Sequence, residues 1–225
     1  MGFVACMLLG HLFISQFMKD LILFGIQGCG KGTQARILSE REGYKVFETG
    51  KELRAIAASD TELGQKVKGI IEAGNLVSDE VVIEIVEAFL ENTPADQAVI
   101  FDGLPRKMTQ KDLFEEVVQK DGRSPIAVLI HLDDEVSVQR LSNRWMSKAS
   151  GKIYPSQEEA MKHESADDLY QRADDVPEAI RTRLETYHRE TQPVIEWYRE
   201  QGRMVEVEGD QPMEEVTAAL LNATQ

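Results

Sequence analysis

Short apolar runs alternate with amphipathic stretches along most of this chain. Four runs are typical of buried strands, at 20–25, 98–101, 126–132 and 203–207. Helical spacing of apolar residues predicts helices after the turn at 25–32 and at 51–73, 80–91, 108–120, 134–145, 177–200 and 212–222. Strands that alternate with helices predict an α/β fold with a parallel core sheet covered on both faces, which is a three-layer arrangement.

Two stretches depart from this alternation. Residues 46–50 form a brief apolar stretch to which the pattern assigns no element, and residues 75–79 are expected to turn. Residues 146–176 are polar and lose their periodicity altogether. A long irregular insertion inside a compact domain is usually a lid or a binding loop, so we expect one there.

The first 17 residues differ in character from the rest. Residues 3–17 are apolar or small and carry no charge, and no basic residue precedes them as a signal peptide would require. A membrane helix needs about 20 apolar residues, and Lys19 and Asp20 interrupt this run. Three interpretations stay open: an upstream extension of the reading frame with Met18 as the start, a weak membrane or partner anchor, or an extra packed helix. We therefore divide the chain into an extension at 1–17 and a core at 18–225.

Composition narrows the class of protein. Of 225 residues, 42% are apolar and 28% are charged, which suits a folded domain with a sizeable core. The formal net charge of −14 argues against broad nucleic-acid binding, although basic residues converging on one cleft could still bind anions. Cys6 and Cys29 alone cannot form a disulfide framework or a zinc pattern, so we expect an intracellular protein.

The segment 25–33 has the composition of a phosphate-binding loop. Its glycines allow the backbone N–H groups to wrap around a phosphate, and Lys31 adds a full positive charge at the start of a helix. A strand before it and a helix after it are the context that such a P-loop requires. Gly32 stands where the usual motif has Ser or Thr, and Thr33 follows, which puts direct ligation of Mg²⁺ by a hydroxyl in doubt. The alternative is a tight turn that binds nothing, with Cys29 as a small spacer in either case.

Four motifs in order along the chain are similar to those of the adenylate kinase family of nucleoside monophosphate kinases. They are GxxGxGKGTQ at 25–34, TGxxLR at 49–54, GxLVxDE at 74–80 and DGxPR at 102–106, and the resemblance runs from about Met18 to the last helix. The resemblance implies a P-loop fold with a mobile AMP-binding insertion at 48–77 and a mobile lid at 143–176. It also implies reversible, Mg²⁺-dependent phosphoryl transfer from ATP to AMP, giving two ADP, by a cytoplasmic monomer active in adenine nucleotide homeostasis.

On the acceptor side, the resemblance implies that Arg54 and Arg106 bind the AMP phosphate. The planar guanidinium group of arginine suits this role, because it can donate two parallel hydrogen bonds. Thr49 and Gln110 would help to read the adenine. The full AMP-binding set implied is Thr49, Arg54, Asn75, Leu76, Val77, Gly103, Leu104, Pro105, Arg106, Gln110, Arg172 and Arg183. Asp102 would orient waters on Mg²⁺.

On the donor side, the resemblance places the ATP adenine against Arg140 and the ATP phosphates beside Arg144. The ATP-binding set implied is Gly28, Cys29, Gly30, Lys31, Gly32, Thr33, Arg140, Arg144, Ile153, Tyr154 and Gln211. The catalytic cations would be Lys31, Arg106, Arg144, Arg172 and Arg183. Phosphoryl transfer needs alignment and charge neutralisation more than a general base, which explains so many cations. Asp174 and Asp175 could pair with the lid arginines, or form a solvated acidic turn.

Several positions depart from the family pattern. Lys51 stands where relatives commonly carry Asp, Glu48 where a small polar residue is common, and Leu104 where Phe is usual. The lid is shorter than the long family lid and has no cysteine, so we expect no zinc site. A kinase for GMP, UMP or CMP is one alternative, which Thr49 and Gln110 disfavour for the pyrimidines. An inactive nucleotide-binding or scaffold protein is another, which Lys31 and the five arginines (Arg54, Arg106, Arg144, Arg172 and Arg183) disfavour.

Overall fold

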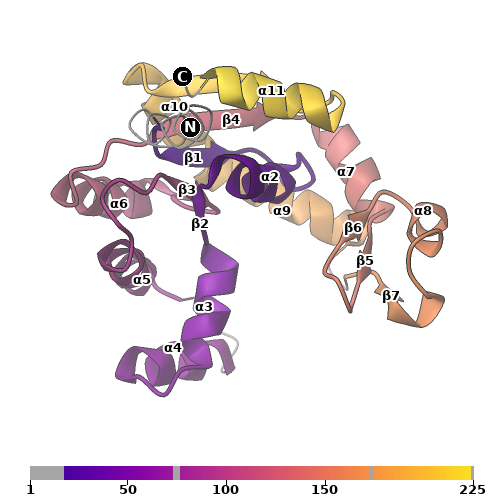
Figure 1. The fold of residues 1–225 in the computed structure, drawn as a ribbon, viewed down its shortest axis with the longest axis horizontal. Coiled ribbons are helices and arrows are strands. Elements are labelled where there is room, and N and C mark those ends of the chain that lie inside the picture. The colour runs from indigo at the N-terminus through magenta and orange to yellow at the C-terminus, as the bar shows by residue number, and fades with distance from the viewer. Residues whose placement is uncertain (1–17, 73–76, 173–174, 224–225) are drawn as a thin grey trace, which may run out of the picture.

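A five-stranded parallel sheet forms the centre of the molecule. The structure is a computed structural model that describes residues 18–72, 77–172 and 175–223. The strands lie in the order β2-β3-β1-β4-β8, as Figure 1 shows in part. Their bounds are β1 Leu21–Phe24, β2 Lys45–Glu48, β3 Val99–Asp102, β4 Ile126–His131 and β8 Met204–Glu208. The predicted α/β fold with a parallel sheet is confirmed.

Helices cover both faces of this sheet, because the apolar residues of each strand point alternately to either side. Ile22 and Phe24 belong to the core beneath α5 (Asp79–Glu91), α6 (Met108–Lys120) and α10 (Gln192–Glu200). Leu21 and Leu23 belong to the opposite core. That second core is formed with α2 (Lys31–Glu42), α7 (Asp134–Ser142), α9 (Pro177–Glu190) and α11 (Met213–Ala223). The result is the three-layer arrangement expected from the sequence.

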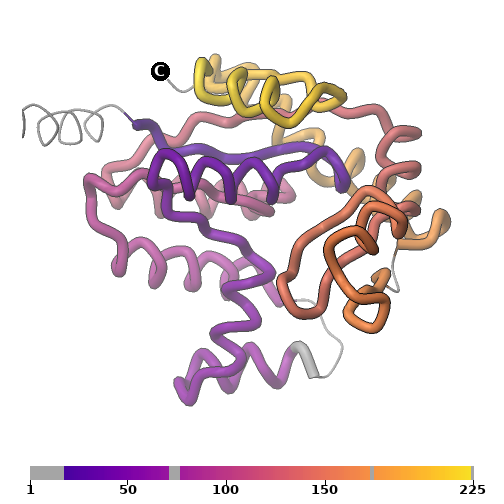
Figure 2. Tube along the Cα trace, turned by 45° about the vertical axis from the view of Figure 1, so that its right-hand side comes forward, coloured from indigo at the N-terminus to yellow at the C-terminus, as the bar shows by residue number. Residues whose placement is uncertain are grey.

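Two smaller units project from the sheet. One contains α3 (Thr49–Ala57) and α4 (Glu62–Glu72). The other is an antiparallel sheet in the order β6-β5-β7, with a short helix and a 3₁₀ turn. Its elements are β5 Trp145–Ser147, β6 Ile153–Tyr154, α8 Gln157–Met161, η1 Ala166–Asp168 and β7 Leu169–Tyr170. Both units stand apart from the central layers in Figure 1, and the orange lid coil lies separate from α4 in Figure 2.

Five sequence predictions need correction. Residues 45–48 form an edge strand in which only Phe47 is fully buried. An apolar pattern this short does not indicate a strand. The helix expected at 51–73 is two helices, because the polar segment 59–61 interrupts it: Ser59 Oγ donates to Ile56 O (2.8 Å) and Thr61 Oγ1 accepts from Gly64 N (3.0 Å).

The other three corrections concern the stretch 146–176 and the helices before and after it. The helix expected at 134–145 ends at Ser142 and is followed by β5, and the stretch 146–176 holds short strands and a helix rather than only loop. Two-residue strands carry too little periodicity to be recognised. The helix expected at 177–200 divides at Thr191, just before Pro193, whose missing N–H is tolerated only in a first helical turn.

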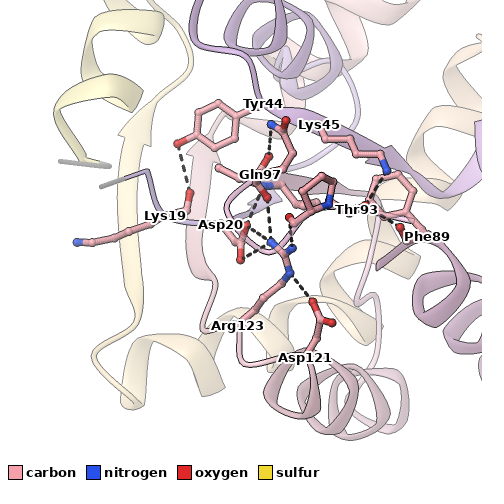
Figure 3. A network of polar contacts seen from close by, with 12 residues as sticks. Lys19, Asp20, Tyr44, Lys45, Phe89, Thr93, Gln97, Asp121 and Arg123 are labelled. Atoms are coloured by element: carbon pink, nitrogen blue, oxygen red, sulfur yellow. Dashed lines mark hydrogen bonds and ion pairs between the residues drawn. The ribbon is translucent and has the colours of Figure 1, made fainter. Parts of the chain in front are cut away.

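A buried ionic network secures the end of β1 that lies away from the phosphate loop (Figure 3). Asp20 Oδ1 accepts from Val99 N (2.7 Å) and from Arg123 Nη1 (3.1 Å). Arg123, which is 5% exposed, also donates to the carbonyls of Gln97 (3.0 Å) and Pro94 (3.1 Å). Burial raises the pKa of the Asp20 carboxyl, and Arg123 opposes that rise. The network joins β1 to the loops beside β3 and after α6.

Some predictions fall outside the described residues. They are those on residues 1–17, on Asn75 and Leu76, and on Asp174. Among the residues that the structure does describe, no helix has both the length and the apolar character needed to cross a membrane.

Candidate active site

The loop between β1 and α2 has the conformation that its glycines allow. Gly28 and Gly30 have φ angles of 86° and 99°, a region that residues with a side chain rarely adopt. Gly25 is needed for space, since a Cβ built there would lie 2.6 Å from the carbonyl oxygen of Ile130. The loop ends at the first turn of α2, where Lys31, Gly32 and Thr33 lie. Free backbone N–H groups at a helix start attract anions, so the loop is suited to phosphate.

Lys31 lies folded over this loop. Its Nζ donates to Gly25 O (2.5 Å) and Ile26 O (3.1 Å) and lies 3.6 Å from Cys29 Sγ. The Cys29 side chain is 3% exposed, which fits a spacer rather than a nucleophile. The loop carbonyls therefore hold the positive charge of Lys31 at the mouth of the phosphate site.

Helix α7 braces the loop from the β4 side. The buried Ser137 Oγ donates to Gln27 O (2.6 Å), and Arg140 Nη1 approaches Gly28 O (3.5 Å) and Gly209 O (3.2 Å). Arg140 Nη2 also donates to Asp210 Oδ1 (2.7 Å), which brings it next to the exposed Gln211. Ser137 was not predicted from the sequence, where its only signal is a polar residue on the buried face of a predicted helix.

The segment that follows β3 faces both the P-loop and the start of α3. A Cβ built on Gly32 would lie 3.7 Å from Asp102 Oδ2, and one built on Gly103 would lie 3.4 Å from Thr49 Oγ1. Thr49 Oγ1 also donates to Asp102 O (3.4 Å). Burial raises the pKa of the Asp102 carboxyl, Lys31 and Arg106 lower it, and the charge of Glu48 raises it further. One carboxylate thus lies between the loop of the donor side and the helix of the acceptor side.

Arg106 is positioned by its neighbours through both its side chain and its backbone. Its Nε donates to Gly103 O (2.6 Å), its N–H donates to Gln110 Oε1 (2.7 Å), and its carbonyl accepts from Thr191 Oγ1 (2.9 Å). Gln110 Nε2 lies 3.4 Å from Asp79 Oδ1. Both ends of the Gln110 amide therefore face protein groups in this conformation.

Leu104 and Pro105 contribute little side-chain surface to the site. The Leu104 side chain is 1% exposed and belongs to the core beneath α5 and α6, and Pro105 is buried. Neither residue therefore offers much exposed surface to a nucleotide in this conformation.

Asp175 joins two arginines at the base of the lid. Its side chain is 1% exposed and accepts two hydrogen bonds from Arg144, from Nε (2.8 Å) and Nη2 (2.7 Å). Arg183 Nη2 lies 3.4 Å from Asp175 Oδ1. The predicted pairing of Asp175 with lid arginines is therefore confirmed, and two of the five candidate catalytic cations share one buried carboxylate.

The other candidate residues lie at the surface or on the projecting units. Arg54 is exposed, with Nη2 3.9 Å from Glu48 Oε1, and Arg172 is also exposed. Ile153 is exposed on the lid, whereas Tyr154 is buried and its hydroxyl lies 2.9 Å from Glu164 Oε1. Val77 is half-buried between α4 and α5. These residues do not converge on one point in this conformation.

Fold and site together define a class: a P-loop phosphotransferase, with a phosphate-binding loop at the carboxyl edge of a parallel sheet and arginines beside this loop and on the projecting units. Comparison with known proteins narrows this class. The family model described as adenylate kinase matches residues 23–203. The chain is 37% identical to an adenylate kinase of Fusobacterium nucleatum over 199 residues, which cover 88% of this chain and 94% of the relative.

Two further relatives agree. An adenylate kinase of Phenylobacterium zucineum is 38% identical, with 89% of this chain and 95% of the relative covered. An adenylate kinase of Chloroherpeton thalassium is 39% identical, with 88% of this chain and 94% of the relative covered. The chain belongs to the adenylate kinase family, and its activity is that of a phosphotransferase with a phosphate group as acceptor.

Proposed function

We propose that the residues identified above carry out reversible transfer of the terminal phosphoryl group of ATP to AMP, giving two ADP. The observation that carries the assignment is the position of segment 102–106. Asp102 faces the first turn of α2, and Gly103 faces Thr49 at the first turn of α3. A donor phosphate on the P-loop and an acceptor phosphate at α3 would then meet beside Arg106.

We assign the donor triphosphate to the loop N–H groups and to Lys31. The ammonium group lies at the mouth of the loop, and its present partners are carbonyl oxygens that a triphosphate could replace. Arg140, already beside the loop and Asp210, would lie against the adenine near Gln211. The lid residues Ile153 and Tyr154 complete the ATP set in this proposal.

We assign the acceptor phosphate to Arg54 and Arg106, with Arg144, Arg172 and Arg183 added from the lid side. A transferred phosphoryl group spreads negative charge over its equatorial oxygens, and arginine guanidinium groups neutralise it without proton transfer. Three of these arginines are exposed: Arg54, Arg106 and Arg172. The lid would therefore have to approach the acceptor unit to bring all five arginines around the phosphoryl group. The insertions at 48–77 and 143–176 would make that movement, which also excludes water.

The residues present fit Mg²⁺ as the ion that accompanies ATP. Asp102 offers hard carboxylate oxygen near the start of α2, and burial raises its pKa, so a nearby cation would favour its charged form. When bound, Mg²⁺ would neutralise charge on the β- and γ-phosphates. Asp102 would orient its waters, which suits an ion that loses water reluctantly. Among the described residues, no group of three or more His, Cys, Asp or Glu side chains could hold another metal.

The finer identity of the acceptor is part of the proposal. Thr49 at the start of α3 and the buried Gln110 favour adenine over a pyrimidine, with the 75–77 backbone as their partner. A cytoplasmic location and a monomeric state, which the resemblance implies, belong to the same proposal.

Removing either of two cations tests the assignment. We expect Lys31→Met and Arg106→Ala each to lower kcat by at least about 100-fold, the effect of losing one charge-stabilising donor. The rate of ADP formation from ATP and AMP measures this, and Arg36→Ala serves as control because Arg36 lies on the exposed side of α2, paired with Glu40. Near-normal turnover in either variant would contradict the site as assigned.

A further inference from the structure

The side chain of Gln110 lies between two protein groups of opposite hydrogen-bonding character. It is 6% exposed, its Oε1 accepts from the backbone N–H of Arg106 (2.7 Å), and its Nε2 lies 3.4 Å from Asp79 Oδ1. A backbone N–H can only donate, and an ionised carboxylate can only accept. The opposite orientation of the amide would place a donor against the N–H and an oxygen against the carboxylate. These two groups therefore fix which end of the Gln110 amide is the oxygen.

Asp79 is itself held in place from the side of α6. It is the first residue of α5, and its side chain is 13% exposed. Its Oδ2 accepts from Thr109 Oγ1 (2.8 Å) and lies 3.0 Å from Lys107 Nζ. Because Oδ2 is engaged by these two side chains, Oδ1 is the oxygen that faces Gln110. The carboxylate is thus a fixed neighbour of the amide, although the two residues belong to different helices.

The orientation of this amide decides which purine it can pair with. An amide has two N–H donors and an oxygen with two lone pairs, so one donor and one acceptor remain after the contacts with Asp79 and Arg106. The pairing edge of adenine offers a donor at its 6-amino group and an acceptor at N1. A 6-oxopurine, such as guanine or hypoxanthine, offers an acceptor at O6 and a donor at N1. A glutamine that can exchange its oxygen and nitrogen by rotation could match either edge, whereas a fixed amide matches one of them.

We propose that Asp79 is a specificity-determining residue of the acceptor site. Together with the N–H of Arg106, it holds the Gln110 amide in the orientation that pairs with a 6-aminopurine nucleoside monophosphate and not with a 6-oxopurine one. This inference deepens the proposed function and rests on it, because it takes Gln110 as a reader of the acceptor base. Asp79 is a positioning residue that acts through Gln110 and needs no contact with the nucleotide.

The ratio of kcat/KM for AMP to kcat/KM for inosine monophosphate tests the proposal, because hypoxanthine differs from adenine only at this pairing edge. We expect Asp79→Asn to lower the ratio about tenfold, the effect of losing one hydrogen bond to a charged group. An asparagine amide can donate as well as accept, so it no longer favours one orientation of Gln110. The change should lie in KM rather than in kcat, and calorimetric Kd values for the two monophosphates without ATP should change by the same ratio.

Thr109→Val is the matched control. It removes a different hydrogen bond to the same carboxylate and leaves Oδ1 of Asp79 facing Gln110, so the ratio should stay within about twofold. Asp79→Glu is a second variant, which keeps a carboxylate and should retain a higher ratio than Asp79→Asn. Both nucleotides are assayed on one preparation, so misfolded protein lowers both rates together and leaves the ratio unchanged.

Three outcomes would overturn the proposal: an unchanged ratio in Asp79→Asn, equal losses in Asp79→Asn and Thr109→Val, or a ratio in Asp79→Glu as low as in Asp79→Asn. Asp79 would then serve only to join α5 to α6. Failure of the proposed function is recognised separately, because the unmodified chain would then transfer no phosphoryl group to AMP.

Discussion

At the scale of single residues, Asp102 combines a functional position with an unfavourable environment. Its carboxyl lies at the end of β3, where burial raises its pKa more than Lys31 and Arg106 lower it. A group whose pKa is higher in the folded than in the unfolded chain favours folding while it is protonated. That contribution is lost as the pH rises through the folded-state pKa.

Asp102→Asn should therefore stabilise the protein in the absence of nucleotide. We expect a gain of about 1 kcal/mol at neutral pH, or roughly 2–4 °C in Tm, because the variant removes a buried charge. The gain should shrink as the pH falls through the raised folded-state pKa, because the folded carboxyl then takes up a proton and its buried charge disappears. Urea unfolding from pH 4 to 8 measures it.

The exposed Asp96→Asn is the control for that experiment, with an expected change within about 0.5 kcal/mol at every pH. A loss of stability in Asp102→Asn at neutral pH would show that Lys31 and Arg106 compensate the charge fully. The same variant should turn over poorly, so here function and stability oppose one another.

At the scale of elements, Asp175 lies where the lid returns to the core. It bonds Arg144, just before β5, and approaches Arg183 on α9, so one carboxylate links both ends of the lid. Breaking a buried pair leaves unpaired charges and costs about 3–5 kcal/mol. Asp175→Asn would keep the shape of the side chain and remove its charge.

We expect Asp175→Asn to lower the free energy of unfolding by about 3 kcal/mol and to lower kcat as the two arginines lose their positions. Urea unfolding and the rate of ADP formation measure the two effects. Glu190→Gln, which breaks the exposed pair with Arg189, should change stability by less than about 1 kcal/mol. Equal stability of the two variants would contradict the role of Asp175.

The sequence predicted some helices and strands well and missed others. The strands β1, β3, β4 and β8 and the helices α5, α6 and α11 were predicted close to their observed bounds, because their apolar residues face two large cores. Helix α2 was predicted without an end. The edge strand at Lys45–Glu48 and the short lid strands were missed, since few of their side chains are buried. The pairing of Glu48 with Asp102 depends on strand order β2-β3, which a single sequence does not give.

The candidate site was predictable to the extent that its residues carry a motif. The glycines of the P-loop, Lys31 and Arg106 are recognisable by type and spacing. Ser137 and Thr191 are not, because a hydroxyl that bonds a distant carbonyl has no local signature. The buried position of Leu104 likewise follows from packing against the core and not from its motif.

At the scale of the whole molecule, the two projecting units hold groups that the reaction needs together. Arg54 lies on the unit formed by α3 and α4, whereas Arg144 and Arg172 lie on and beside the lid. Between these two units, the edge of the central sheet holds Asp102 at the end of β3. Arg106 follows shortly after it, and Lys31 lies at the start of α2. Transfer between two nucleotides explains why two separate units are present, since each would close over one substrate.

The most direct test of this account is a coupled assay of the purified full chain with Mg-ATP and one monophosphate at a time: AMP, GMP, UMP or CMP. The account predicts ADP formation that depends on AMP, with far slower turnover of UMP and CMP, whose pyrimidine bases Thr49 and Gln110 are proposed to disfavour. Turnover confined to a different monophosphate would contradict the assigned acceptor pocket, and ATP binding without transfer to any of the four would contradict the catalytic site itself.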